Sequence, residues 1–425
     1  MPLSIAIVGG GPAGLAVAER IARKAPQARI DVVDRLPVPF GLARYGLAPD
    51  RALDRTISAL FSRALAAKSV AFWGNVALGR EFDLADLRML YDVVVIASGA
   101  GPDRRLDVPG DQLAGVWGAG AFLRWLNGDP ELAAPPPPLE RVHSVIVIGQ
   151  GSVALEVARF LARSPKELAR ADLDPEIAAA LAAMPLQTIH VVGRNDLLAS
   201  RFQPADLVDL RKLARAQAVI DPEALTQAET VAGDLDRDRK ALLRAFAGLA
   251  AVPRDAKRLP IRFQFRLQPL RLDGGASVER AIFTRPDRLG QNLALRAELV
   301  IAAIGFERTA AYDRLADDRG LIAPGLYAAG WAKRGASGTV AEIVADARLV
   351  ADRVLKEAST MPSTRPGRAG LARLLEERGA APVGRAGWQR IDAAERAAAA
   401  RPRPRRRLRA LDALLSAAAG PERLL

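Results

Sequence analysis

The N-terminal residues 3–14, LSIAIVGGGPAG, limit the fold of this chain most strongly. Residues 5–8 are apolar at every position, which is typical of a strand buried on both faces of a parallel sheet. Gly9, Gly11 and Gly14 have the spacing that permits a tight turn, a close approach of backbone to a pyrophosphate, and close packing of the next helix. Asp34 ends the next apolar stretch, where a carboxylate can accept the ribose hydroxyls of a bound adenosine. Together these features predict a Rossmann-type dinucleotide-binding unit.

The same pattern begins again in the middle of the chain. Residues 143–148 form another apolar stretch, and GQGSVA at 149–154 has the glycine spacing with alanine in the third place. Residues 189–193 predict the next strand, and Arg194 stands at its end in place of an acid. An arginine there can hold a 2′-phosphate, which a carboxylate would repel. We therefore expect an α/β chain with two Rossmann-like dinucleotide-binding domains, the second of them suited to NADP.

The remaining segments give less specific predictions. Prolines and glycines in residues 35–50 oppose regular structure, and a loop of this length inside a compact domain is usually functional. The arginine-rich residues 401–409 predict a solvated tail or surface cover, with a second docking site as the alternative. Periodicity predicts helices at 15–23, 53–66, 153–162, 174–183, 339–355, 371–378 and 391–399, and helical structure across 204–250. It also predicts short strands at 70–72 and 76–78, and the strands of one sheet that returns to the core at 261–268, 277–284 and 295–306.

The composition excludes several classes of protein. The chain has no cysteine, which excludes disulfides, cysteine-ligated iron–sulfur clusters and dithiol redox motifs. Its net charge of +13 favours an anionic partner, but it has no recognisable module for reading nucleic acid. An acidic protein or a phosphorylated cofactor accounts for the charge equally well, so we expect no nucleic-acid partner. No apolar run is long enough to cross a bilayer and no signal peptide is recognisable, so we expect no membrane association and a cytoplasmic location.

Four stretches resemble the ferredoxin–NADP(+) reductases of the adrenodoxin reductase type, in that family's order and spacing: RLPVPFGLARYGLAPD, IGQGSVALEVARFL, VVGR and GWAKRGASG. GWQRIDAAE, near Trp388, extends the likeness almost to the end of the chain. The resemblance implies an FAD-binding domain, formed by residues 1–108 and by 311–425 with a C-terminal extension, into which an NADP-binding domain of residues 109–310 is inserted. It also implies an FAD-dependent oxidoreductase that passes electrons between NADPH and a ferredoxin-type one-electron carrier, by hydride transfer to flavin N5.

The resemblance also assigns site residues. The FAD site would contain Gly9, Gly11, Ala13, Gly14, Asp34, Leu42, Val76, Trp331, Gly338, Thr339 and Val340. The NADP site would contain Gln150, Gly151, Ser152, Val153, Arg194, Asn195 and Asp206. The catalytic positions would be Trp331, Gly338, Arg51 and Asp206. The helix that begins near Thr339 would point its positive end at the flavin and stabilise negative charge there.

Three positions depart from the family's pattern. Asn195 stands where the family has a second arginine, Arg51 where it has a histidine, and Asp206 where it has a glutamate. Losing one of two guanidiniums would cost about 1 to 3 kcal/mol of selectivity for the phosphate. Arg201 is near enough in sequence to compensate.

The expected protein partner is an acidic ferredoxin. Arg237, Arg239, Lys240 and Arg244 are spaced to share much of one helix face, which could dock it through electrostatic steering. A solvated helix face is the alternative. Other functions stay open as well: a flavin-dependent monooxygenase or a diaphorase without a ferredoxin partner, and a non-catalytic flavoprotein that senses redox state. The missing cysteines oppose a thioredoxin-reductase-like enzyme and the electron-feeding subunit of glutamate synthase.

Overall fold

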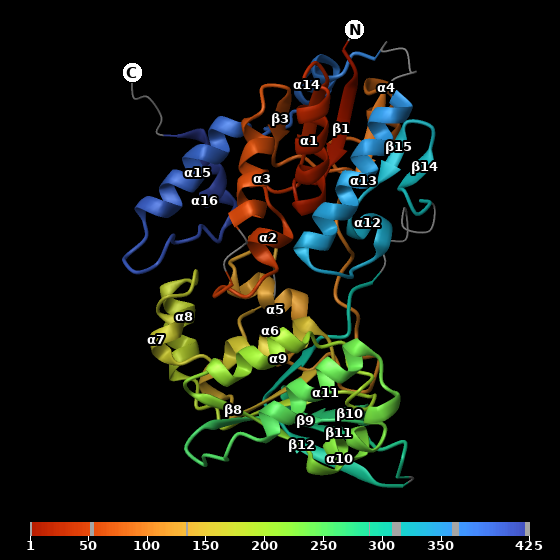
Figure 1. The fold of residues 1–425 in the computed structure, drawn as a ribbon. Helices are drawn as coiled ribbons and strands as arrows, with labels where there is room; N and C mark the ends of the chain where they lie inside the picture. The colour runs from red at the N-terminus through yellow and green to blue at the C-terminus, as the bar shows by residue number, and fades with distance from the viewer. Residues whose placement is uncertain are drawn as a thin grey trace.

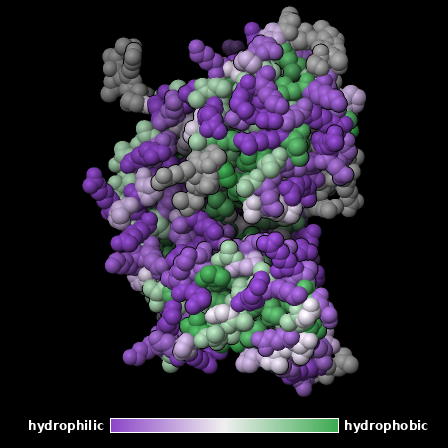
Figure 2. All heavy atoms as spheres, in the orientation of Figure 1, coloured by the Kyte–Doolittle hydropathy of each residue, from purple (hydrophilic) through white to green (hydrophobic). Residues whose placement is uncertain are grey.

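The computed structural model describes residues 2–51, 55–132, 135–288, 290–307, 316–358 and 365–420. Two α/β lobes lie one above the other, and the N-terminal strand and the C-terminal helices belong to the same lobe (Figure 1). The first lobe is built around a sheet with strands from both ends of the chain, whereas the strands of the second lobe come from its middle. Hydrophilic side chains cover much of the face in Figure 2, and the molecule narrows where the lobes meet.

The sheet of the first lobe has the strand order β14-β15-β4-β1-β2-β3 and is parallel apart from β14. Its strands are β1 (Ser4–Val8), β2 (Arg29–Val33), β3 (Val70–Trp73), β4 (Val93–Ile96), β14 (Leu321–Ala323) and β15 (Leu326–Ala328). Ile5 and Ile7 pack with the helices α1 (Pro12–Lys24), α3 (Arg55–Ala66) and α13 (Val340–Ala358). Ala6 and Val8 point to the other face, which α4 (Leu84–Leu90) and α14 (Arg368–Glu377) cover. The uninterrupted apolar run of β1 is therefore explained by helices on both faces.

The sheet of the second lobe is parallel throughout and has the order β5-β13-β6-β7-β9-β8. Its strands are β5 (Val116–Gly118), β6 (Ser144–Ile148), β7 (Thr188–Val192), β8 (Ala216–Ile220), β9 (Leu259–Gln264) and β13 (Leu299–Ala302). One face packs against helices that include α5 (Ala119–Leu126), α6 (Ser152–Leu161), α9 (Pro204–Asp209) and α11 (Arg237–Ala250). An antiparallel sheet of β10 (Gln268–Gly274), β11 (Val278–Thr284) and β12 (Asn292–Arg296) covers the opposite face.

The remaining helices lie at the edges of the two lobes. They are α2 (Leu42–Tyr45), α7 (Pro165–Leu168), α8 (Pro175–Ala183), α10 (Pro222–Thr230), α12 (Trp331–Arg334), α15 (Arg385–Ala397) and α16 (Leu411–Ala419). The last two pack on each other beside α3 in the first lobe (Figure 1). No described helix has both the length and the apolar character needed to span a bilayer. Within the described residues, His and acidic side chains form no group able to hold a metal ion.

Three sequence predictions were wrong in detail. The segment 204–250 is not helical throughout, because β8 lies within it and pairs with β9 at the edge of the second sheet. The segments between 261 and 306 do not form one sheet, since β9 and β13 join the parallel sheet while β10–β12 form the antiparallel one. Residues 76–78 form no strand: Asn75 adopts a left-handed φ of 62° and turns the chain, and the Val76 amide donates to the Asp34 carbonyl at 3.0 Å.

Candidate nucleotide-binding sites

Two glycines of the first motif are required by the packing of the protein itself. Gly9 has a φ of +112°, and a Cβ there would lie 2.3 Å from the Ala97 carbonyl oxygen. A Cβ on Gly14 would lie 1.9 Å from the Gly9 carbonyl oxygen, so its absence lets α1 approach the end of β1. These two positions would demand glycine whether or not a ligand binds.

The middle glycine of each motif has no such explanation within the protein. Gly11 and Gly151 precede α1 and α6 with φ values of −81° and −118°, which any residue can adopt. A Cβ on Gly11 would meet only the Gly41 Cα at 4.0 Å, and a Cβ on Gly151 would meet nothing within 4 Å. Both glycines stand at the N-terminal end of a helix, where free amides attract phosphate. The space above each one fits the close approach of a dinucleotide pyrophosphate.

Asp34 lies next to the first glycine turn, directly after β2. Its carboxylate accepts hydrogen bonds from the backbone amides of Gly10 at 2.7 Å and Leu36 at 2.9 Å. Burial raises the pKa of Asp34 to about 6, although these two amides oppose the shift. Val76 is fully buried beside it, and the loop 35–50 folds over the turn through a bond of 2.8 Å from the Phe40 amide to the Gly10 carbonyl.

The segment with Trp331 closes the other side of this turn. Gly330 has a φ of +63°, and a Cβ there would lie 2.5 Å from the Cβ of Ala13. The structure thus brings two predicted FAD contacts, Ala13 and Trp331, to the same place. Trp331 begins α12, its indole donates to the Ser337 carbonyl at 3.0 Å, and its ring lies 5.5 Å from the ring of Phe306. Leu42, the predicted contact on the opposite loop, begins α2.

Glu342 was missed by the sequence analysis. Its carboxylate accepts from the Thr339 amide at 2.6 Å, and its own amide donates to the Thr339 hydroxyl at 3.3 Å. This reciprocal pair caps the N-terminus of α13 next to Gly338 and Val340, and it places a negative charge where the helix end is positive. The threonine–glutamate spacing of a capping box is present in the sequence and could have identified it.

In the second lobe, the side chain of Gln150 holds the turn that follows β7. Its oxygen accepts from the Asn195 amide at 3.0 Å, and its nitrogen donates to the carbonyls of Asn195 at 3.1 Å and Asp196 at 3.2 Å. A Cβ on Gly193 would collide with this side chain at 1.8 Å. Gln150 therefore sets the position of Arg194, whose exposed side chain lies on the same turn. Ser152 and Val153, the other predicted contacts, form the first turn of α6.

Arg51 and Asp206 are 155 residues apart in the sequence, and the structure brings their side chains together. The guanidinium of Arg51 donates to the Asp206 carboxylate at 2.8 Å and lies 3.6 Å from Glu156. Burial opposes the charge of Arg51, but the hydrogen bond to Asp206 and the charges of Glu156, Asp206 and Asp50 together outweigh it and raise the pKa of the guanidinium. The neighbouring Asp50 accepts from Arg163 at 2.7 Å and also pairs with Arg159, so loop 35–50 is anchored to the second lobe.

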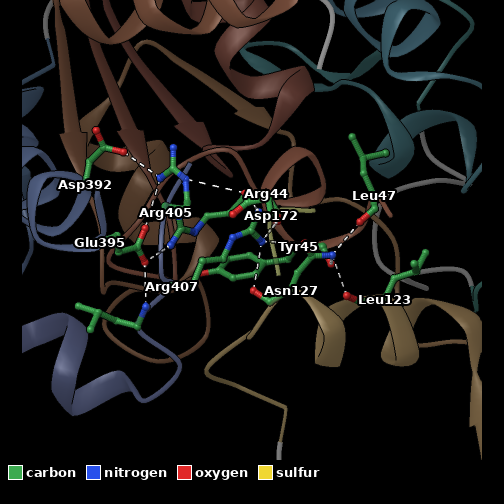
Figure 3. A network of polar contacts seen from close by, with 11 residues as sticks. Arg44, Tyr45, Leu47, Leu123, Asn127, Asp172, Asp392, Glu395, Arg405 and Arg407 are labelled. Carbon is green, nitrogen blue, oxygen red and sulfur yellow. Dashed lines mark hydrogen bonds and ion pairs between the residues drawn. The ribbon is translucent and has the colours of Figure 1, made fainter. Parts of the chain in front are cut away.

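A buried ion pair anchors the same loop to the C-terminal helices (Figure 3). Arg44 donates to Glu395 of α15 at 2.5 Å, and their side chains are 4% and 0% exposed. The guanidinium carbon lies 5.1 Å from the ring centre of Tyr45 and 5.6 Å from that of Trp388. Burial opposes the charge, but Tyr45 and Glu395 outweigh it and raise the pKa of Arg44.

Of the two predictions for the arginine-rich residues 401–409, the solvated tail is wrong, and the segment lies on the surface across both lobes. Arg407 donates to the Asn127 side chain at 2.8 Å and to Asp172 at 2.6 Å, both in the second lobe (Figure 3). Burial lowers the pKa of Arg407. Arg405 donates to Asp392 at 2.9 Å in the first lobe. The segment is an interlobe clamp, in which Arg405 and Arg407 pair with carboxylates of the first and second lobe respectively.

The predicted docking face lies on α11 and is narrower than expected. Arg237, Lys240 and Arg244 are exposed and, at 100° per residue, point in nearly the same direction. Arg239 lies about 200° away from Arg237 on this helix and is half-buried. Arg239 therefore does not share the face.

Comparison with known proteins agrees with this arrangement. Residues 3–206 match the family described as pyridine nucleotide-disulphide oxidoreductase. The mitochondrial NADPH:adrenodoxin oxidoreductase of Homo sapiens is 32% identical, with 92% of this chain and 87% of that protein covered. The cindoxin reductase of Citrobacter braakii is 35% identical, with coverages of 92% and 86%.

A solved structure is similar over the whole fold. The Mycobacterium tuberculosis protein FprA in complex with NADPH matches 99% of this chain and 100% of its own, with 31% identity and a TM-score of 0.90. This agreement confirms an α/β architecture of two Rossmann-like domains, one inserted into the other. The chain belongs to the adrenodoxin reductase family of FAD-dependent NADPH oxidoreductases.

Proposed function

We propose that the protein is a ferredoxin–NADP(+) reductase that holds FAD in the first lobe and NADPH in the second. The observation that carries the proposal is the pair Gly11 and Gly151: the protein leaves each glycine uncovered at a helix N-terminus, as a bound pyrophosphate requires. FAD, when bound, accepts two electrons from NADPH and can release them one at a time. We place the domain boundaries near residues 108 and 310, because the strands of the second lobe run from β5 to β13.

In this proposal the chain's own residues bind and orient the two nucleotides. Asp34 accepts ribose hydroxyls at the first turn, and Arg194 takes the 2′-phosphate at the second. Trp331 and Gly338 border the place where the reacting rings would meet, and no proton donor is needed there for hydride transfer. Gln150 is a positioning residue, because it fixes the turn that carries Arg194.

Glycine substitutions test the proposal because they separate folding from binding. Gly151→Ala should leave the fold intact, since its Cβ meets no protein atom, but should weaken NADP+ binding by blocking the pyrophosphate. Gly11→Ala should do the same for FAD. Gly14→Ala is the contrasting variant and should impair folding, because its Cβ would lie 1.9 Å from a carbonyl oxygen. Unchanged affinity for NADP+ and FAD in the first two variants would contradict the proposal.

The colour and the reduction of the purified protein test the proposed function more directly than the glycine variants. It should be yellow and should bleach under anaerobic conditions when NADPH is added, with kcat/KM for NADPH above that for NADH. Equal values for the two coenzymes would remove the assigned role of Arg194. Bleaching by NADPH without electron delivery to any acidic ferredoxin would favour a diaphorase or monooxygenase, and failure to bleach would favour a redox sensor. The expected cytoplasmic location stays a prediction.

For the partner, we propose that the exposed face of Arg237, Lys240 and Arg244 docks an acidic ferredoxin. Charge reversal at all three should raise the KM for ferredoxin, most strongly at low ionic strength, and spare reduction of a small dye. Arg373→Glu, at an exposed position of α14 in the first lobe, is the control. Equal losses with ferredoxin and dye would contradict docking at α11.

A further inference from the structure

The turn after β7 lacks one of the two arginines that the family's pattern places there, because Asn195 follows Arg194. Another arginine lies directly beside this turn. The amide of Arg266 donates to the Asn195 carbonyl at 3.0 Å, and the amide of the next residue, Leu267, donates to the Gly193 carbonyl at 2.9 Å. The chain leaving β9 is thereby held alongside the proposed phosphate-binding turn. This proximity follows from the sheet order, in which β9 is the neighbour of β7.

The backbone of Arg266 has an unusual conformation. Its φ is +56°, in the left-handed region that residues with a Cβ seldom occupy. Such a conformation costs free energy and persists where the surroundings impose it, commonly at functional sites. A glycine would adopt it without strain, so packing of the backbone alone does not account for an arginine here.

The charge of Arg266 is only weakly compensated. The one ion pair of its side chain among the described residues is with Asp287, at 3.8 Å, and the side chain is 39% exposed. Asp287 also forms an ion pair with Arg285 at 3.6 Å. The Nε of Arg285 is buried and has no hydrogen-bond partner. Two guanidiniums therefore share one carboxylate at long distance, so the Arg266 guanidinium makes no close ion pair with a described residue and can turn to an anionic ligand.

These groups line a hollow that continues from the phosphate-binding turn. Its walls include Asp196 and Leu197 from that turn, Phe265 and Arg266 after β9, and Arg285 and Asp287 after β11. Asp221 and Glu223, at the start of α10, line it as well, but Asp221 accepts from the Glu223 amide at 3.0 Å and Glu223 pairs with Arg288 at 2.6 Å. The hollow lies at the carboxyl edge of the second sheet, where ligands of parallel α/β sheets bind.

We propose that Arg266 supplies the second guanidinium for the 2′-phosphate of NADP(H), and so determines specificity against NAD(H). The proposal rests on the proposed function, in which the second lobe binds NADP. Arg266 replaces, from the neighbouring strand's end, the arginine that is missing at position 195.

Arg201 is the competing candidate, and the structure separates the two. Its amide donates to the Gln150 carbonyl at 2.7 Å, and its backbone pairs with Gly151. Arg201 thus flanks the glycines that face the pyrophosphate, a group present in both NADP and NAD. Loss of Arg201 should weaken both coenzymes alike, whereas loss of Arg266 should weaken only the phosphorylated one.

The test measures the Kd of the FAD-loaded oxidised protein for NADP+ and for NAD+ by isothermal titration calorimetry. Arg266→Gly removes the guanidinium and relieves the left-handed backbone, so it should fold at least as well as the parent. We expect it to raise the Kd for NADP+ about 10- to 100-fold and leave that for NAD+ within about twofold. Arg266→Lys should restore part of the loss, because it keeps the charge but not the fork of donors.

Two control variants distinguish the outcomes. Arg201→Ala should raise both dissociation constants together. An unchanged Kd for NADP+ in Arg266→Gly, or an equal loss for both coenzymes, would overturn the role of Arg266. Arg194→Ala should lower the preference for NADP+ in either case. If the parent protein itself shows no preference for NADP+ over NAD+, the second lobe is not an NADP site and the proposed function itself fails.

Discussion

The buried pair of Arg44 and Glu395 provides a quantitative test of what holds the FAD-side loop in place. Glu395→Ala would leave the Arg44 charge in a position where its side chain is only 4% exposed, with Tyr45 and Trp388 as its nearest rings. It would also remove the acceptor of the Leu408 amide, at 3.0 Å. Removing one partner of a buried ion pair costs about 3 to 5 kcal/mol, so we expect a loss of that size.

The measurement is equilibrium urea unfolding of the holoprotein, followed by circular dichroism and by release of FAD fluorescence. Glu377→Ala is the matched control, because Glu377 and its partner Arg373 lie on the outer side of α14 with side chains 62% and 78% exposed. Its loss should stay below about 0.5 kcal/mol. The double variant Arg44→Met with Glu395→Met should lose less than the sum of the single losses by about 2 kcal/mol or more. A Glu395→Ala loss no larger than the control would refute the reasoning.

Three further predictions concern other charged groups. The pKa of Asp34 is raised from 3.8 to about 6, so between these pH values the folded apoprotein binds more protons than the unfolded chain. The contribution of Asp34 to stability is therefore present below pH 3.8 and is lost as the pH rises through 6. Asp34→Asn should abolish this pH dependence in urea unfolding of the FAD-free protein. Arg407→Ala should destabilise the interlobe contact by about 1 to 3 kcal/mol, seen as faster hydrogen exchange around Asn127 with unchanged exchange in β1. Glu342→Gln should shift the midpoint potential of the bound FAD to a more positive value in a potentiometric titration, because it removes a carboxylate from the N-terminus of α13.

The parts of the fold that sequence predicted well are those encoded over short distances. The first strand, glycine turn and helix involve neighbours within about twenty residues, so the order of apolar and glycine residues specifies them. β8 was missed because five residues between two charged helical segments carry too short a pattern, and only pairing with β9 selects the strand. The interlobe clamp was missed because it also depends on contacts between distant parts of the chain. Arg407 pairs with Asp172, 235 residues away, and a run of arginines does not indicate such a partner.

The candidate site divides in the same way. Gly9, Gly14 and Asp34 could be predicted because their roles follow from local geometry. Gln150 was named as a contact, but its actual bonds join it to a turn 45 residues later. Arg266 carried no signal at all, since its importance comes from a left-handed backbone and from the adjacency of β7 and β9. Sequence thus predicted the two glycine turns better than the side-chain contacts around them.

The pair of Arg51 and Asp206 shows how two departures from the family's pattern can compensate each other. A longer base replaces histidine and a shorter acid replaces glutamate, and the two still meet at 2.8 Å. The difference lies in the protonation of the base. A guanidinium stays charged throughout the physiological pH range, whereas an imidazole has an ordinary pKa near 6.5. The kcat/KM for NADPH should therefore show no transition from this position between about pH 5.5 and 8. Arg51→His should introduce one, with activity falling as the imidazolium loses its proton, while Arg51→Lys should keep the parent profile. If Arg51→His and the parent protein had the same pH profile of kcat/KM, the charge at this position would not act on the reaction.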